Sequence, residues 1–235
     1  MYRLADKNIE IKSLFPKVQE LCRGYETDGK ADFTISITRA DIAFERERSS
    51  EEGMFHDAYL ETLAVYRKIA EKMPYYNTLL FHGSCIAVDG EAYLFTAKSG
   101  TGKSTHARLW RELLGERAVM VNDDKPLLRL CEGRAIVYGT PWDGKHHLST
   151  NVAVPLKALC ILERGKENHI ERMTRSEAFP MLLQQAYRPM DAAALGKTLS
   201  LIDELSGCVT LYRLRCNMDL SAAQLSYDTM KGQRK

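Results

Sequence analysis

The chain has 235 residues and a formal net charge of +2, and 45% of its residues are hydrophobic while 27% are charged. These values predict a soluble globular protein with one α/β domain and an added subdomain, or with two small domains. The near-neutral charge argues against a nucleic-acid-binding protein. No apolar run reaches about 18 residues, the length that a membrane-spanning helix needs, so no contact with a membrane is expected.

Six cysteines are scattered along the chain without a CxxC pair or a zinc-type spacing. A disulfide framework is not expected in a chain of this length, so we interpret the cysteines as reduced, packed thiols. The N-terminal sequence MYRLADK is too polar for a secretory signal. Together these features predict a cytoplasmic protein.

Residues 1–75 predict a small α+β subdomain. Apolar periodicity predicts its elements as short strands at 9–11 and 33–37, a short helix at 14–22 and an amphipathic helix at 55–69. The alternating charges of residues 45–48 indicate a solvated strand edge or loop. Pro74 ends the amphipathic helix, and the main domain is expected to span residues 76–235.

The sequence of the main domain, residues 76–235, predicts a mixed sheet with flanking helices. Its strands are expected at 79–88, 93–96, 118–121 and 209–214, and its helices at 103–114, 175–187, 193–205 and from 221 onward. Asp89-Gly90 predicts a tight hairpin turn, and two further hairpins are expected at residues 132–133 and 164–165. Gly115 is a suitable residue to end the helix at 103–114.

Residues 97–104 read AKSGTGKS, which matches the Walker A pattern with alanine in place of the first glycine. Glycines at 100 and 102 allow the backbone N–H groups to turn inward toward an anion, and the following helix adds its positive end. We therefore expect an ATP-binding loop formed by Ser99, Gly100, Thr101, Gly102, Lys103, Ser104 and Thr105. Lys103 would neutralise the phosphates. The alternative is an ordinary glycine-serine turn that begins a helix.

An acidic pair, Asp123 and Asp124, follows the strand predicted at 118–121. A P-loop ATPase needs a carboxylate at the end of a nearby strand to hold Mg²⁺. Two adjacent acids offer two roles, because one can bind the metal while the other accepts a proton from a hydroxyl nucleophile. We group Asp124 with Ser104 as metal ligands and Asp123 with the catalytic residues, while the division of roles between the two acids stays open. The alternative is a solvated turn.

A second unusual segment, residues 139–147, reads GTPWDGKHH. Lys145 could place positive charge on a transferring phosphoryl group, and Trp142 could stack on a base or a substrate. The alternative, weighed equally, is a structural turn with Trp142 in the core. His146 and His147 are adjacent and would point apart on a strand, so metal binding by this pair is not expected.

The order of these motifs resembles that of the HPr serine kinases/phosphorylases, whose wider group includes the ATP-dependent phosphoenolpyruvate carboxykinases. The sequence FHGS at 81–84 precedes the glycine-containing loop, and NDD at 122–124 follows it. The resemblance covers residues 78–165 and implies the fold of the HPr kinase catalytic domain. It also implies a catalytic role for His82 and, for the acidic pair, one base and one magnesium ligand. The basic loop that engages the HPr protein is not found, so HPr itself is not expected as substrate.

These observations favour an ATP- and Mg²⁺-dependent phosphotransferase that moves the γ-phosphoryl group to a serine-type hydroxyl of a peptide, a protein or a small metabolite. Asp123, His82 and Lys103 are the expected catalytic residues. Two alternatives stay open: a carboxykinase-like lyase, and a non-catalytic ATP-binding partner in a peptide-modification pathway. Whether the chain forms a homo-oligomer also stays open.

Overall fold

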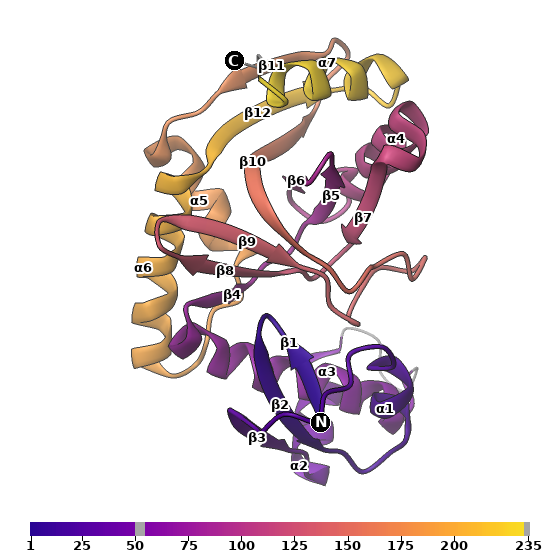
Figure 1. The fold of residues 1–235 in the computed structure, drawn as a ribbon, viewed down its shortest axis with the longest axis vertical. Coiled ribbons are helices and arrows are strands. Elements are labelled where there is room, and N and C mark those ends of the chain that lie inside the picture. Colours follow the sequence, from indigo (N-terminus) through magenta and orange to yellow (C-terminus); the bar gives the residue numbers. More distant parts are fainter. Residues whose placement is uncertain (50–54, 233–235) are drawn as a thin grey trace.

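The computed structural model describes residues 1–49 and 55–232 of the chain, which form a mixed α/β structure (Figure 1). The larger of its sheets is curled and joins β4 (Thr78–Leu80), β5 (Ser84–Val88), β6 (Glu91–Thr96), β7 (Ala118–Asn122), β8 (Leu127–Cys131), β9 (Arg134–Tyr138), β10 (Ala153–Arg164), β11 (His169–Arg172) and β12 (Thr210–Cys216). The prediction of a mixed α/β fold is confirmed.

Strand β10 is the junction of this sheet. Its first residues pair antiparallel with β9, and its remaining length pairs parallel with both β6 and β12. β5 lies between β6 and β7 and is antiparallel to both. Strand β6 therefore lies inside the sheet, where its C-terminal end carries the glycine-containing loop.

Helices cover both faces of this part of the sheet. Along β5 and β6, alternate side chains belong to different cores: Cys85 and Leu94 pack toward α5 (Arg175–Gln185) and α6 (Ala192–Cys208). Ile86 and Phe95 pack toward α4 (Lys103–Leu114) and α7 (Leu220–Met230). This alternation follows from the two-residue period of a strand, and burial on both faces explains the continuous apolar run in the sequence.

The N-terminal part lies below the larger sheet in Figure 1. It contains a three-stranded sheet of β1 (Tyr2–Leu4), β2 (Lys7–Lys12) and β3 (Phe33–Ser36), with helices α1 (Lys17–Leu21), α2 (Arg39–Arg48) and α3 (Asp57–Lys72). Its core includes Leu127, Tyr138 and Trp142 of the larger part, so the two parts share side-chain packing. The proposed division between residues 75 and 76 stays a prediction.

Three local predictions are wrong. Residues 45–48 belong to helix α2, because Thr38 and Asp41 form a capping box at its start and Arg67 of α3 pairs with Glu45. The strand expected at 79–88 is interrupted at 81–83, where the chain passes from β4 to β5. The turn at 164–165 does not close a hairpin, because β10 and β11 both pair with β12 and not with each other.

The remaining local predictions agree with the structure within a few residues. The turn at Asp89-Gly90 joins β5 and β6, and the turn at 132–133 joins β8 and β9. α3 ends at Lys72, and a short 3-10 helix, Met73–Tyr76, follows across Pro74; a second one, Gly115–Arg117, follows α4. Among the described helices, none has the length and apolar character that crossing a membrane requires.

Candidate functional site

The glycine-containing loop connects the end of β6 to the start of α4. Gly100 and Gly102 both have positive φ, 76° and 123°, which is the left-handed region that favours glycine. α4 begins at Lys103 without a side-chain cap on its first backbone N–H groups. The positive end of the helix and its N–H groups are thus available to an anion.

Lys103 lies at this helix start and is 9% exposed. Its ammonium group contacts the carbonyl oxygen of Ala97 at 3.2 Å. Burial lowers the pKa of Lys103, and the nearby carboxylates of Asp124 and Asp123 oppose that shift. The side chain therefore supplies a partly desolvated positive charge between the loop and the acidic pair.

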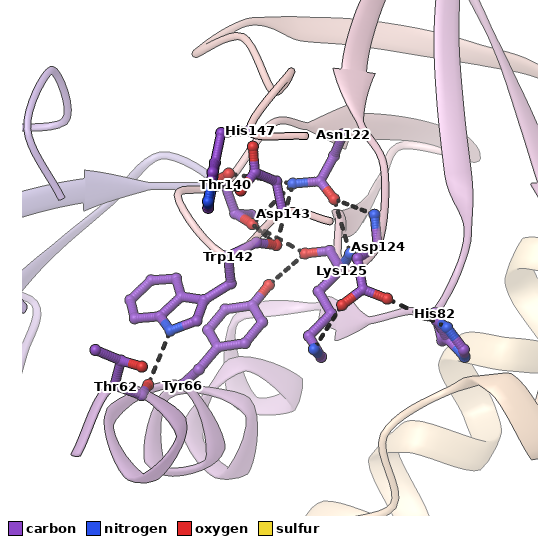
Figure 2. Close-up of polar contacts among 10 residues, drawn as sticks. All are labelled: Thr62, Tyr66, His82, Asn122, Asp124, Lys125, Thr140, Trp142, Asp143 and His147. Carbon is purple, nitrogen blue, oxygen red and sulfur yellow. Dashed lines mark hydrogen bonds and ion pairs between the residues drawn. The ribbon is translucent and has the colours of Figure 1, made fainter. Parts of the chain in front are cut away.

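Asn122 holds the acidic pair in its conformation. This residue is fully buried at the end of β7, and its side-chain oxygen accepts hydrogen bonds from the backbone N–H groups of Asp124, at 2.9 Å, and Lys125, at 2.7 Å. Its amide nitrogen donates to the carbonyl and the hydroxyl oxygens of Thr140 (Figure 2). The turn that presents the two acids is thus tied to the segment that precedes Trp142.

The two acids have different surroundings. The Asp124 carboxylate lies 2.6 Å from the Lys125 ammonium nitrogen and 3.2 Å from Nε2 of His82. Burial raises the pKa of Asp124, but the interactions with His82 and Lys125 outweigh it and lower the pKa to about 2. Asp123 is 6% exposed and accepts a hydrogen bond from the buried Ser84 hydroxyl. Asp124 is therefore a permanently ionised carboxylate near neutral pH.

Gly83 is required where the chain crosses from β4 to β5. A Cβ atom on it would lie 2.9 Å from the Phe95 carbonyl oxygen and 2.9 Å from a methyl carbon of Leu94. The Gly83 backbone N–H donates to the carbonyl oxygen of Asp124, and the His82 N–H donates to that of Gln185. The interruption of the predicted strand thus brings His82 to the acidic pair.

Most of the residues predicted for the site line one cavity of about 750 Å³. Its wall includes His82, Ser99, Gly100, Gly102, Lys103, Ser104, Thr105, Asp123, Asp124 and Lys145. Thr101 lines an adjacent cavity of about 450 Å³, which shares Gly100, Gly102 and Thr105 with the first and extends to the C-terminal ends of β10 and β12. No group of three or more His, Cys, Asp and Glu side chains suited to a metal ion occurs at residues 1–49 and 55–232.

Trp142 is not part of this cavity wall, which corrects the suggestion that it stacks on a substrate. Its side chain is buried, and its indole N–H donates to the Thr62 carbonyl oxygen at 2.8 Å. Its ring stacks on Tyr66 of α3, whose hydroxyl donates to the carbonyl oxygen of Lys125 (Figure 2). Burial raises the pKa of Tyr66, so this phenol stays protonated. Helix α3 thus supports the acidic pair through these two rings.

Two features of the site escape the sequence analysis. One is the hydrogen bond from Ser84, a buried residue of the FHGS segment, to the Asp123 carboxylate. The other is a pair formed by Asp143 and His147, whose facing ring nitrogen and carboxylate oxygen lie 2.9 Å apart. The sequence signal for this pair is the spacing of four residues between Asp143 and His147. Strand-like alternation at 146–147 hides the signal, because it suggests only that the two histidines point apart.

The fold and the cavity define a mixed α/β protein in which an uncapped helix start, a lysine and an acidic pair meet. The family model described as "SynChlorMet cassette protein ScmC" matches residues 44–202. The chain therefore belongs to the SynChlorMet cassette protein ScmC family. No curated protein matches it. The solved structure of the Hpr(Ser) kinase/phosphatase from Coxiella burnetii is similar to it with 10% identity and a TM-score of 0.35, over 65% of this chain and 99% of that chain.

Proposed function

We propose that this protein is an ATP-dependent phosphotransferase that moves the γ-phosphoryl group of ATP to a serine-type hydroxyl. The observation that carries the proposal is the shared cavity of the helix start at Lys103 and the acidic pair Asp123 and Asp124. Phosphoryl transfer requires little covalent chemistry from the protein and depends on positioning and on charge stabilisation. A cavity with anion-binding N–H groups, a lysine and two carboxylates provides both.

The described residues fit ATP. The positive φ values of Gly100 and Gly102 and the uncapped start of α4 suit the β- and γ-phosphates, and Lys103 would neutralise their charge. The adjacent cavity of about 450 Å³ has space for the base and lies between Leu109 of α4 and Leu162 of β10. Thr105 lines both cavities, so an ATP molecule could place its phosphates in the first cavity and its base in the second.

The residues also fit a magnesium ion. The carboxylate of Asp124 is ionised, with a pKa of about 2, and the exposed hydroxyl of Ser104 opens on the same cavity. Mg²⁺ is usually held by one or two carboxylates together with substrate phosphates. When bound, the ion would offset negative charge on those phosphates.

The acceptor hydroxyl would enter from the part of the cavity formed by Asp123, His82 and Lys145. Asp123 would orient or deprotonate this hydroxyl as its oxygen attacks the γ-phosphorus. Lys145 is exposed, lines the cavity and carries no ion pair in the part of the chain that the structure describes. Its charge is therefore free to meet the transferred group or an anionic part of the acceptor.

The test is turnover of γ-labelled ATP by the wild type and by Lys103→Ala, with cell extract as the source of acceptors. The wild type should transfer the label to a product that mass spectrometry identifies, and Lys103→Ala should not. The matched control is Lys98→Ala, because Lys98 is an exposed lysine of the same loop outside the cavity wall. Binding of ATP by the wild type without turnover in any extract would contradict transfer and favour the non-catalytic partner.

A further inference from the structure

The loop between β9 and β10 carries a buried carboxylate bonded to an exposed imidazole. The Asp143 side chain is 4% exposed, whereas that of His147 is 77% exposed. One carboxylate oxygen of Asp143 lies 2.9 Å from the Nδ1 of His147, and the other accepts from the backbone N–H and the hydroxyl of Ser149. A carboxylate has no proton to donate, so Nδ1 carries the proton and the Nε2 atom of neutral His147 keeps a free lone pair.

The backbone of this loop is held in an unusual conformation. His147 has φ = +48°, in the left-handed region that non-glycine residues seldom adopt. Its N–H donates to the Gly144 carbonyl oxygen, and the contact that Gly144 makes with Asp123 is so close that an added Cβ would lie 2.8 Å from the Asp123 carbonyl oxygen. The backbone of the loop therefore packs directly against Asp123.

The N-terminal part braces the same loop from outside. The Asn151 side chain donates to the Gly24 carbonyl oxygen at 2.8 Å. Tyr25 is buried beside Ser149 and Asp143, and burial raises the pKa of its phenol to about 12. The printed partners of the Asp143 carboxylate are therefore two neutral donors of Ser149 and the imidazole of His147.

The carboxylates of the cavity are less suited to accept a proton. Asp124 is engaged by His82 and Lys125 and would hold the metal. Asp123 already accepts a hydrogen bond from the Ser84 hydroxyl and would be engaged in orienting the acceptor. Two histidines of this cavity are paired with a carboxylate. His82 contacts Asp124, which would hold the metal, whereas His147 contacts Asp143, whose side chain is only 4% exposed and would hold no metal.

From this geometry we infer that His147, oriented by Asp143, accepts the proton of the attacking hydroxyl, while Asp123 orients that hydroxyl. The inference rests on the proposed function. A bond forms between the acceptor oxygen and the γ-phosphorus, and the bond from the γ-phosphorus to the bridging oxygen of ADP breaks. The hydroxyl proton moves to Nε2 of His147, and ADP leaves with the electron pair of the broken bond. The imidazolium that forms is stabilised by the Asp143 carboxylate, as in other carboxylate–histidine pairs.

Other titratable groups on the cavity could also affect a pH profile. They are the acids Asp123 and Asp124, the lysines at 103, 125 and 145, the histidines at 82 and 146, and Tyr59 of α3. His146 is the most useful of them as a control. It is exposed, adjacent to His147 and lacks a carboxylate partner in the described part of the chain.

The experiment compares His147→Asn with His146→Asn in the full chain. Asparagine tolerates the left-handed backbone of residue 147 and keeps a side-chain donor for Asp143, so the loop should stay folded. ADP release from Mg·ATP is measured across pH 5 to 8, the range in which histidines usually titrate, with water as the acceptor. Binding of a fluorescent ATP analogue gives a readout that is independent of turnover.

His147→Asn should lower the rate by about 100-fold or more, the usual scale for loss of a general base. It should also abolish the fall in wild-type rate toward acid pH and leave affinity for the ATP analogue unchanged. Added imidazole should restore activity to His147→Ala, and His146→Asn should resemble the wild type. A His147→Asn protein with the wild-type rate and pH profile would overturn the inference while leaving the proposed function intact. Absence of turnover by the wild type with water and with extract would instead contradict the proposed function, and the inference with it.

Discussion

The ring of Trp142 lies parallel to the ring of Tyr66, with centroids 4.3 Å apart and an angle of 5° between the ring planes. Trp142 belongs to the loop between β9 and β10 of the larger sheet, and Tyr66 belongs to α3 of the N-terminal part. Through the Tyr66 hydroxyl the stack reaches the backbone of Lys125, next to the acidic pair. The N-terminal part is thus a structural support of the candidate site.

Trp142→Ala should lower the free energy of unfolding by about 3–5 kcal/mol, because it empties a large buried volume and removes the bond to Thr62. Urea denaturation followed by circular dichroism measures this change. Tyr59→Ala on the exposed side of α3 is the control and should change stability little. Equal stability of the two variants would contradict a supporting role for the aromatic stack.

Asn122→Ala should weaken both the fold and the site. The N–H groups of Asp124 and Lys125 would lose their acceptor, and a buried unsatisfied group costs about 1–3 kcal/mol. We expect a lower denaturation midpoint together with reduced turnover of ATP. Asn8→Ala is the matched control, since that asparagine donates to the Lys30 carbonyl oxygen at an exposed position outside the cavity wall. Wild-type turnover in Asn122→Ala would show that the turn does not need this amide.

Asp123→Asn should leave ATP bound but nearly unreactive. The amide keeps the size of the side chain, so the helix start and Lys103 can still hold the nucleotide, while the charge that orients the hydroxyl is lost. Equilibrium binding of a fluorescent ATP analogue and turnover of labelled ATP separate the two effects. Full activity in Asp123→Asn would remove Asp123 from the catalytic residues.

Stability should decline between pH 6.5 and about 4 because of His106. Burial lowers the pKa of this histidine from 6.5 to about 4, and its Nε2 lies 3.0 Å from the Ser226 hydroxyl. Within that window the unfolded chain takes up a proton that the folded chain excludes, so acid favours unfolding. The contribution is fully present above pH 6.5 and is lost as pH falls through the folded value.

Urea denaturation at several pH values tests this assignment. His106→Gln should flatten the pH dependence of the free energy of unfolding in this window, because glutamine does not titrate. His169→Gln changes an exposed histidine and should leave the slope as in the wild type. A slope that survives in His106→Gln would assign it to other groups.

Local sequence signals predicted the parts of the fold that depend on near neighbours. Helix α4, the turn at Asp89-Gly90 and the placement of the glycine loop after β6 follow from periodicity and turn chemistry. The errors arose where distant segments decide the outcome. The turn at 164–165 looks like a hairpin until the parallel pairing of β10 with β12 is known. Residues 45–48 look like a strand edge or loop until Arg67 of α3 is seen to pair with Glu45 on helix α2.

The candidate site shows the same limit. The glycine loop and the acidic pair are each a run of adjacent residues that can be recognised in the sequence. The sequence was therefore sufficient to predict that both belong to one site. The sequence leaves Trp142 open between substrate stacking and the core, because its partners Thr62 and Tyr66 lie far away along the chain. The pairing of Asp143 with His147 depends on a left-handed backbone at residue 147, which strand-like alternation does not suggest.

The position of β10 in the sheet has a consequence for biosynthesis. β6 carries the glycine loop, yet its parallel neighbour β10 begins at Ala153, and the second parallel neighbour of β10 ends at Cys216. Such sequence-distant pairings form slowly, since a long stretch of chain must close before they contribute. A ribosome-bound chain would therefore expose the loop at 97–102 well before β10 and β12 are available to complete the sheet around β6.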